Sequence, residues 1–122
     1  MKRDFDLIRR ILTDIENMPA GRFLDDINYP GEYDCQTVYE HAALLIEDAD
    51  LVKGTVLRAD DSIIDVRITG LTWKGHDFIG AAKDSSIWTK AKETVLKPAV
   101  AITFDVLLEW LKAQAKQQLG LP

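Results

Sequence analysis

Two histidines and one cysteine are the most obvious candidates in this sequence for acid–base, nucleophilic or metal chemistry. His41 and His76 lie 35 residues apart, and neither has a second histidine or cysteine at the spacing of a metal-ligand pair. A zinc site needs three or four converging ligands. His76 is followed by Asp77, but adjacent residues of a helix point in different directions. We therefore expect no metal ion, and we expect His76 to pack near Trp73 and to bond locally at the start of its helix.

Cys35 falls in the first turn of an expected helix, where the helix dipole can activate a thiol. A catalytic pair with His41 would require a spacing of one or two whole helical turns, and six residues is neither. Gly70 and Gly75 do not form a phosphate-binding loop, and no Gly-x-Ser-x-Gly sequence is present. We therefore expect a protein that is not an enzyme, with no catalytic residue and no cofactor.

The composition is that of one globular domain. The chain has 122 residues, of which 47% are hydrophobic and 29% charged, and its net charge is −5. A chain of this length buries roughly two-thirds of its unfolded surface without a metal or a disulfide. Its apolar runs, such as residues 42–46, are far shorter than the ~20 residues of a membrane span. The start of the sequence lacks the apolar core of a signal peptide, so a cytoplasmic protein is expected.

The two halves of the sequence differ in charge. Residues 1–61 carry 7 basic and 14 acidic side chains, whereas residues 62–122 carry 8 basic and 6 acidic ones. Phosphate contacts dominate the affinity of nucleic-acid-binding proteins, which therefore usually present a basic face. The acidic N-terminal half disfavours DNA as a partner unless its few basic groups gather on one side. The candidates for such a cluster are Lys2, Arg3, Arg9 and Arg10 near the start, followed by Lys53, Arg58, Arg67 and Lys74.

The elements that would position these residues are predicted from apolar periodicity and from capping residues. Residues 3–18 and 35–48 are predicted helices, and residues 19–33 are predicted to form a loop. Strands at 55–58 and 63–69 are expected to form a β-hairpin around the turn 59–62. Further helices are expected from Thr72, over 87–96 and from Thr103, with Asp34, Thr72 and Thr103 as N-caps. We expect one domain over residues 1–122, in which residues 87–122 form a C-terminal helical extension.

Side-chain directions follow from the same periodicities. In the second strand, Ile64, Val66 and Ile68 are expected on the buried face, because side chains alternate along a strand. In the second helix, His41 is expected on or near the solvated side, together with Glu40, Glu47 and Asp48. In the last helix, Val106 and Trp110 lie four residues apart and outside the main apolar stripe, so they are adjacent on the helix surface. They form a candidate partner interface, for which packing within the chain is the alternative.

The order helix, loop, helix, two-stranded hairpin, helix resembles a winged-helix domain. The stretch 38–52 is similar to the third helix of bacterial winged-helix regulators, with Asp50 where that pattern has glycine, and Asp tolerates a left-handed conformation. The segment 68–78 is similar to the Leu-Thr-x-x-Gly segment that follows such wings. A complete helix-turn-helix has one more helix before the recognition helix. Between Met18 and Asp34 that helix is either very short or absent, because Pro19, Gly21, Pro30 and Gly31 interrupt the segment.

The sequence also resembles the DUF2513 family of small bacterial and phage-associated proteins of unknown function. The residues that carry this resemblance are 1–9 (MKRDFDLIR), 71–78 (LTWKGHDF), 87–92 (IWTKAK) and the leucine-rich C-terminal helix. The resemblance implies no catalytic residue and no ligand.

Two functions fit these observations. The first is a non-enzymatic winged-helix module of the α+β class that acts through protein–protein contacts, as a homodimer or with a host or phage protein. The alternative is a DNA-binding transcriptional regulator that reads DNA with the helix beginning near Asp34. Its candidate contacts are Gln36, Thr37, Tyr39, Glu40, Arg58 and Arg67. The acidic residues of the helix and of the hairpin turn, Asp60 and Asp61, favour the first function over the second.

Overall fold

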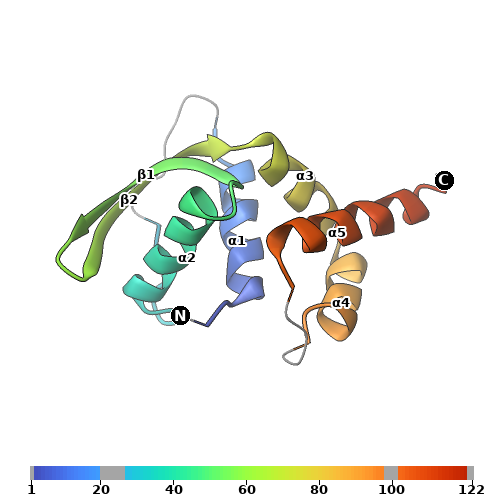
Figure 1. Ribbon diagram of the computed structural model, residues 1–122, viewed down its shortest axis with the longest axis horizontal. Helices are drawn as coiled ribbons and strands as arrows, with labels where there is room; N and C mark the ends of the chain where they lie inside the picture. The colour runs from blue at the N-terminus through green and yellow to red at the C-terminus, as the bar shows by residue number, and fades with distance from the viewer. Residues whose placement is uncertain (1, 20–26, 98–101, 121–122) are drawn as a thin grey trace.

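The computed structural model describes residues 2–19, 27–97 and 102–120. Within these ranges the α+β fold is confirmed, with five helices and a two-stranded antiparallel hairpin (Figure 1). This arrangement is consistent with helices plus a β-hairpin wing. The elements in chain order are α1 (Phe5–Glu16), α2 (Cys35–Glu47), β1 (Val52–Ala59), β2 (Ser62–Leu71), α3 (Trp73–Ala82), α4 (Ser85–Thr94) and α5 (Phe104–Gln118).

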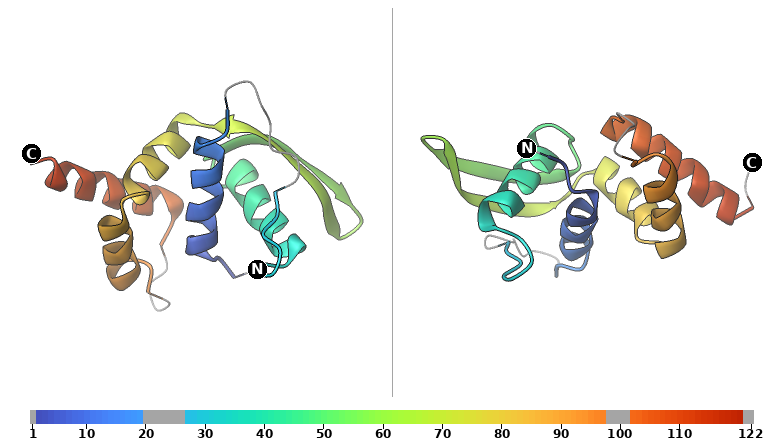
Figure 2. Two further views of the ribbon diagram at one scale, coloured as in Figure 1. Left: turned by 180° about the vertical axis from the view of Figure 1, so that it is seen from behind. Right: turned by 90° about the horizontal axis from the view of Figure 1, so that it is seen from below.

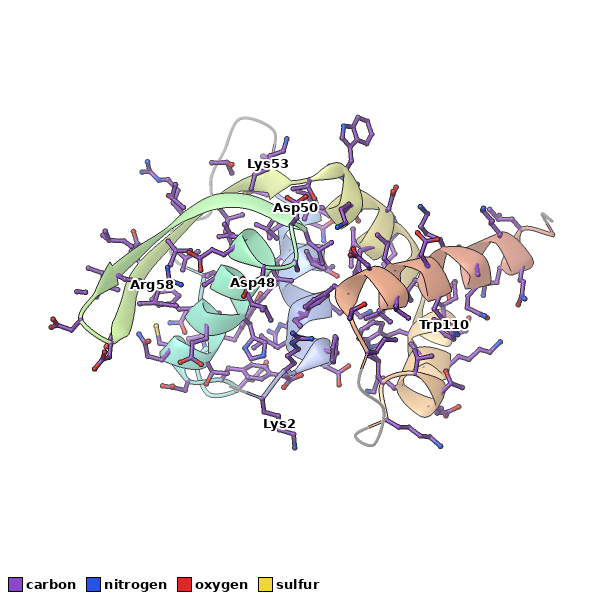
Figure 3. The ribbon with its side chains drawn as sticks, viewed as in Figure 1. Lys2, Asp48, Asp50, Lys53, Arg58 and Trp110 are labelled. Atoms are coloured by element: carbon purple, nitrogen blue, oxygen red, sulfur yellow. The ribbon has the colours of Figure 1, made fainter. Side chains whose placement is uncertain are left out.

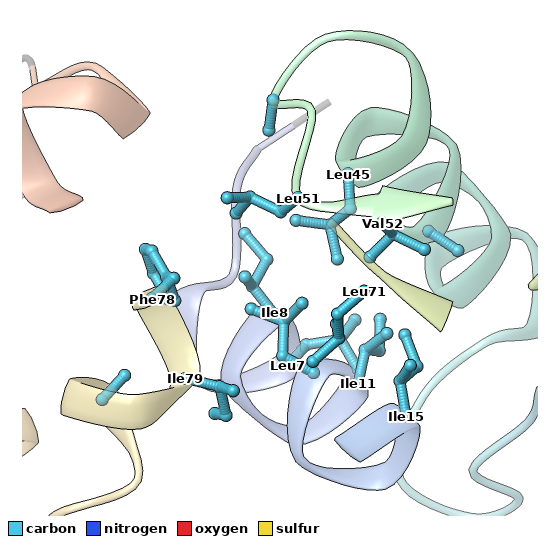
Figure 4. Close-up of a cluster of buried hydrophobic side chains, with 14 of the residues drawn as sticks. Leu7, Ile8, Ile11, Ile15, Leu45, Leu51, Val52, Leu71, Phe78 and Ile79 are labelled. Carbon is cyan, nitrogen blue, oxygen red and sulfur yellow. The ribbon is translucent and has the colours of Figure 1, made fainter. Parts of the chain in front are cut away.

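Helix α1 lies at the centre of the molecule. Asp4 caps it, because the Asp4 carboxylate accepts a hydrogen bond of 3.0 Å from the Leu7 amide. Apolar residues at spacings of three and four then give α1 one continuous buried face. Figure 4 shows this face in contact with side chains from α2, the hairpin and α3, so α1 joins all three. The buried residues of α1 are Leu7, Ile8, Ile11, Leu12 and Ile15.

The hairpin curves over α2, which covers its inner face (Figure 1). Its strands are longer than predicted, and two irregularities interrupt their register, between Lys53 and Gly54 and between Leu57 and Arg58. The second of these corrects a prediction. Because Leu57 pairs with Asp65 and Arg58 pairs with Ile63, Ile64 is the extra residue of a β-bulge and points into solvent. Ile63 takes the buried position instead, in line with Val66 and Ile68.

The root of the hairpin is the point where the chain leaves α2 and later enters α3. Asp50 adopts the left-handed conformation expected for it, with φ 55°. The Thr72 amide donates to the Leu51 carbonyl at 3.1 Å, and the Thr72 hydroxyl donates to the Asp50 carbonyl at 2.6 Å. A β-carbon at Gly75 would lie 1.9 Å from the Leu51 oxygen. The first turn of α3 can therefore contact the residues after α2 only because position 75 carries no side chain.

Helices α3, α4 and α5 form the other end of the molecule (Figure 2). Thr72 and Thr103 cap α3 and α5 as predicted, by accepting hydrogen bonds from Gly75 and Val106. Helix α4 begins two residues earlier than predicted, because the Asp84 carboxylate accepts from the Ser86 and Ile87 amides. Helix α5 packs across α3 and buries its leucines at 107, 108 and 111.

The segment before α2 is only partly described, since residues 20–26 lie outside the described residues. The short helix left open between Met18 and Asp34 falls largely in this part. In residues 27–34 the chain forms a turn in which the Tyr29 carbonyl accepts from the Glu32 and Tyr33 amides. Asp34 occupies the N-cap position of α2, as predicted, but its carboxylate makes no capping hydrogen bond. None of the helices in the described ranges is both long and apolar enough to span a membrane.

Two glycines of α3 give a matched test of the hairpin root. We expect Gly75→Ala to lower the free energy of unfolding by about 1–3 kcal/mol, because the new methyl group overlaps the Leu51 carbonyl. Gly80 has open space within its own chain where a β-carbon would be, so Gly80→Ala should stabilise the monomer by about 0.5–1 kcal/mol. Urea unfolding followed by circular dichroism measures both. Equal effects of the two substitutions would contradict the close approach at Gly75.

Candidate functional site

The six residues proposed for DNA contact do not form one free surface. Gln36 is bound to the hairpin, because its side-chain amide donates to the Ile63 carbonyl at 2.6 Å and its oxygen accepts from the Ile63 amide at 3.3 Å. Tyr39 is buried, and the Thr37 carbonyl lies 2.7 Å from Nδ1 of His41. Glu40 is exposed. Gln36 thus holds α2 against β2, which explains why a glutamine stands at this position without a nucleic-acid partner.

The two candidate arginines of the hairpin lie on opposite faces. Arg58 turns toward α2 and makes two hydrogen bonds with the Glu47 carboxylate, at 2.7 and 2.5 Å (Figure 3). The pair lowers the pKa of Glu47 through these hydrogen bonds. Arg67 pairs with Thr55 across the ladder, in the exposed row of the outer face. The two guanidinium groups therefore do not converge on one phosphate path.

Arg3, Arg9 and Arg10, three of the four basic candidates near the start of the chain, are also used in internal contacts. Arg9 donates to the carbonyls of Ala82 and Lys83, at 2.7 and 3.0 Å, and so binds the C-terminal end of α3. Arg3 lies over the Phe104 ring of α5. Arg10 pairs with Glu32 of the loop before α2. The basic cluster that sequence position suggested therefore acts largely in joining elements of the fold.

A hollow of about 590 Å³ opens between the first turn of α1, α2 and the last turns of α4. Polar and charged groups of both signs face it, and this is the arrangement that an acid–base or ligand-binding site would require. Its lining is formed by Lys2, Arg3, Asp4, Phe5, Asp6, Tyr33, Thr37, His41, Lys92 and Leu96.

His41 is fully buried at the wall of this hollow, which corrects its predicted position on the solvated side of α2. Its Nε2 atom accepts a hydrogen bond of 2.9 Å from the Asp4 amide. Its Nδ1 atom lies 2.7 Å from the Thr37 carbonyl, so Nδ1 carries the proton and donates it. Both nitrogens are therefore used, one in α2 and one at the cap of α1. The histidine fixes α1 to α2 rather than presenting a base to the hollow.

Asp6 is the most strongly bonded carboxylate of the hollow. It accepts from the Trp88 indole at 2.9 Å and from the Lys92 ammonium at 3.1 Å, and so joins α1 to α4. Burial alone would raise the pKa of Asp6, but these two hydrogen bonds and the charges of Lys92 and Arg9 outweigh it and lower the pKa. Burial and the negative charges of Asp4 and Asp6 raise the pKa of Tyr33. Asp6 and Lys92, two of the charged groups of the hollow, thus satisfy each other.

The other predicted candidates lie apart. Cys35 is an exposed free thiol, whereas His41 is buried, and His76 is exposed on α3. Among the residues that the structure describes, no group of three or more His, Cys, Asp or Glu side chains could hold a metal ion.

On α5, Val106 is 57% exposed, whereas Trp110 packs against the hydrophobic core and is half-buried. The adjacent pair expected from the sequence therefore divides: Trp110 belongs partly to the interior, and Val106 faces solvent.

Trp73 is the feature that sequence reasoning missed. It stands in the first turn of α3 with 87% of its surface exposed. Beside it is a hollow of about 360 Å³ that it lines together with Lys53, Leu71 and His76. Lys53 points away from the helices (Figure 3), so Trp73 borders the outer side of the hairpin. The helical spacing of Phe78, Ile79 and Ala82 could have predicted this exposure. These buried residues define one side of α3, and at 100° per residue Trp73 falls on the opposite side.

Comparisons with known proteins give a family but no activity. The family model described as "Hypothetical protein (DUF2513)" matches residues 2–101. An uncharacterized protein of Haemophilus influenzae is 28% identical over 123 residues, covering 98% of this chain and all of that protein. No solved structure matches.

The role of His41 can be tested by His41→Leu. The substitution leaves the Asp4 amide in a part-buried place without its acceptor, so we expect the free energy of unfolding to fall by about 1–3 kcal/mol. His76→Leu changes the exposed histidine and is the matched control, with an expected effect within about 0.5 kcal/mol at concentrations at which the chain is monomeric. Urea unfolding at neutral pH compares the two. A histidine that served only a ligand would leave stability unchanged at both positions.

Asp6 makes part of the stability dependent on pH. Because its pKa is lowered on folding, its contribution is present above the unfolded value of about 3.9 and is lost as the pH falls through the folded value. We expect Asp6→Asn to lower the melting temperature at about pH 6 and to leave it nearly unchanged well below the unfolded pKa. Thermal unfolding of both proteins across this range measures the difference. A constant gap between them at every pH would contradict the role of the charge.

Proposed function

The chain belongs to the DUF2513 family, and from the geometry of its surface we propose that it is a non-enzymatic, winged-helix-like module that acts through protein–protein contacts. Its partner is a second copy or a host or phage protein.

The observation that carries this proposal is the exposure of Trp73. Tryptophan is the residue type most enriched at the energetic centres of protein interfaces, because it buries a large apolar area and loses little conformational entropy. Here it stands next to a hollow, where a partner can enclose both faces of the indole. Leu57 and Ile64 add two exposed apolar side chains near the outer end of the hairpin. Val106 on α5 remains a further candidate contact.

The chemistry of the larger hollow supports a role without catalysis. Both nitrogens of His41 are bonded within the chain, and Asp6 is held by Trp88 and Lys92. A general base needs a free lone pair within reach of a substrate proton. His41 uses its lone pair on the Asp4 amide, and Asp6 is paired with the Lys92 ammonium, so both groups join α1 to its neighbours and support the fold.

Charge and internal pairing favour a protein partner over DNA. The tip of the hairpin, where a DNA-binding wing would meet phosphates, carries the exposed carboxylates of Asp60 and Asp61. Gln36 and Arg58 are bound within the chain and would have to leave their partners to read a base or a phosphate. Regulation through DNA binding remains the alternative function. It predicts retention on duplex DNA at about 50 mM salt that is lost as salt rises. Absence of retention at that salt concentration is the result we expect.

The proposal is tested by site-specific photo-crosslinking in cells that express the chain naturally. A photoreactive phenylalanine analogue replaces Trp73 in one variant and Lys116, an exposed residue of α5, in a matched control. We expect position 73 to crosslink to one defined protein, identified by mass spectrometry, and position 116 not to crosslink to it. Crosslinks at neither position, or equal crosslinking at both, would contradict a protein-binding surface at Trp73.

A further inference from the structure

We propose that the outer face of α3 is a self-complementary dimer interface, in which two copies of the chain pair their α3 helices side by side and parallel about a two-fold axis. The inference rests on the proposed function and names the partner as a second copy. The outer face of α3 is defined by its exposed residues Trp73, His76, Asp77 and Gly80.

These four residues share one side of α3. Trp73 and Gly80 are seven residues apart, or two turns, and so lie on one line along α3. His76 and Asp77 lie between them in height and on opposite flanks of that line, because each residue adds 100°. All four are exposed, and the buried residues of α3 occupy the opposite side.

Gly80 is the residue of this face that carries no side chain. A β-carbon at this position would meet nothing within 4 Å, and its φ is not in the left-handed region. The fold of one chain therefore gives no reason for glycine here, although a glycine inside a helix costs about 0.5–1 kcal/mol relative to alanine. A glycine on an exposed helix face lets a second backbone approach closely. The backbone at Gly80 is thus suited to be the crossing point of two helices.

The polar residues on the two flanks of this face, His76 and Asp77, complement each other between two copies. A two-fold axis parallel to the helices exchanges their flanks, so His76 of each copy meets Asp77 of the other. An imidazole N–H can donate to a carboxylate, and the contact is made twice. Lys53 lines the same hollow as His76 and adds a cation to that flank. In an antiparallel pair the flanks would not exchange, and Asp77 would face Asp77. The charges therefore select the parallel arrangement.

Pairing of the two α3 helices also covers Trp73. In the parallel pair the two indoles meet near the axis at the N-terminal end of α3, and each lies next to the hollow of the other copy. That hollow, of about 360 Å³, opens directly beside Trp73. One arrangement thus covers the most exposed tryptophan, fills the hollow next to it and uses the glycine two turns away.

Sedimentation equilibrium of the full chain tests the interface. We expect a monomer–dimer equilibrium whose dissociation constant rises about ten-fold or more in Trp73→Ala. Leu119→Ala removes another exposed apolar side chain, at the end of α5, and should leave the constant unchanged. His76→Glu should weaken the dimer by opposing two carboxylates, and adding Asp77→Lys should restore it. A chain that stays monomeric at high concentration, or a dimer insensitive to Trp73→Ala, would overturn the proposal.

A disulfide crosslink tests whether the two helices cross at Gly80, and the charge exchange at positions 76 and 77 tests their parallel orientation. In a Cys35→Ser background, Gly80→Cys places one thiol at the crossing point of each helix, and no side chain of the same copy obstructs it. We expect oxidation to link two copies through this position and not through Ala113→Cys, an exposed control on α5. A dimer that fails to crosslink at position 80 would overturn the pairing of the two α3 helices at Gly80. In the photo-crosslinking experiment above, capture of a different protein at position 73 would overturn the homodimer and leave the proposed function standing.

Discussion

The close contact between the first turn of α3 and the residues after α2 is the constraint on which the rest of the structure depends. Two hydrogen bonds from Thr72 and the absence of a side chain at Gly75 bring these segments together at the root of the hairpin. Because the contact closes the hairpin at its base, it fixes where the hairpin crosses α2 and in which direction α3 leaves. The direction of α3 in turn decides which of its sides meets α1 and α5 and which side carries Trp73 into solvent.

Much of this architecture follows from local sequence signals. The N-caps Thr72 and Thr103, the apolar face of α1 and the left-handed Asp50 each depend on a few neighbouring residues, and each was predicted. The predictions that were wrong concerned features that depend on contacts between segments distant in the sequence. The bulge at Ile64 arises from the pairing of two strands, so alternation along one strand pointed to the wrong isoleucine.

The candidate site was harder to predict than the fold for the same reason. His41 is buried at the contact between α2 and the start of α1, where its Nε2 atom accepts from the Asp4 amide 37 residues away, and nothing in the sequence around His41 indicates that partner. Asp6 meets Trp88 and Lys92 only once α4 is packed against α1. Trp73 is different, because the periodicity of its own helix places it opposite the core. Its exposure could have been predicted from the sequence by extending the helical periodicity of α3 back to its first turn.

Helix α5 lies outside the part of the chain that the family model matches. The family model ends at residue 101, before α5 begins, although α5 buries three leucines and Arg3 and Phe5 both contact its Phe104. The part of the fold that the family model covers therefore includes the hairpin root, the hollow beside Trp73 and the outer face of α3. The residues that form these features lie within the matched region. Helix α5, which completes the core, lies outside it.

The bulges of the hairpin bear on how the chain behaves in a crowded solution. In the described part of the chain the sheet has only two strands, so each strand presents one edge of backbone amides and carbonyls that no third strand covers. Regular edges of this kind recruit strands from other molecules and lead to aggregation. The two register shifts break the even spacing of these groups and increase the local twist. The irregularity that misdirects a simple alternation argument thus makes the edges of this hairpin less regular as templates for strands of other molecules.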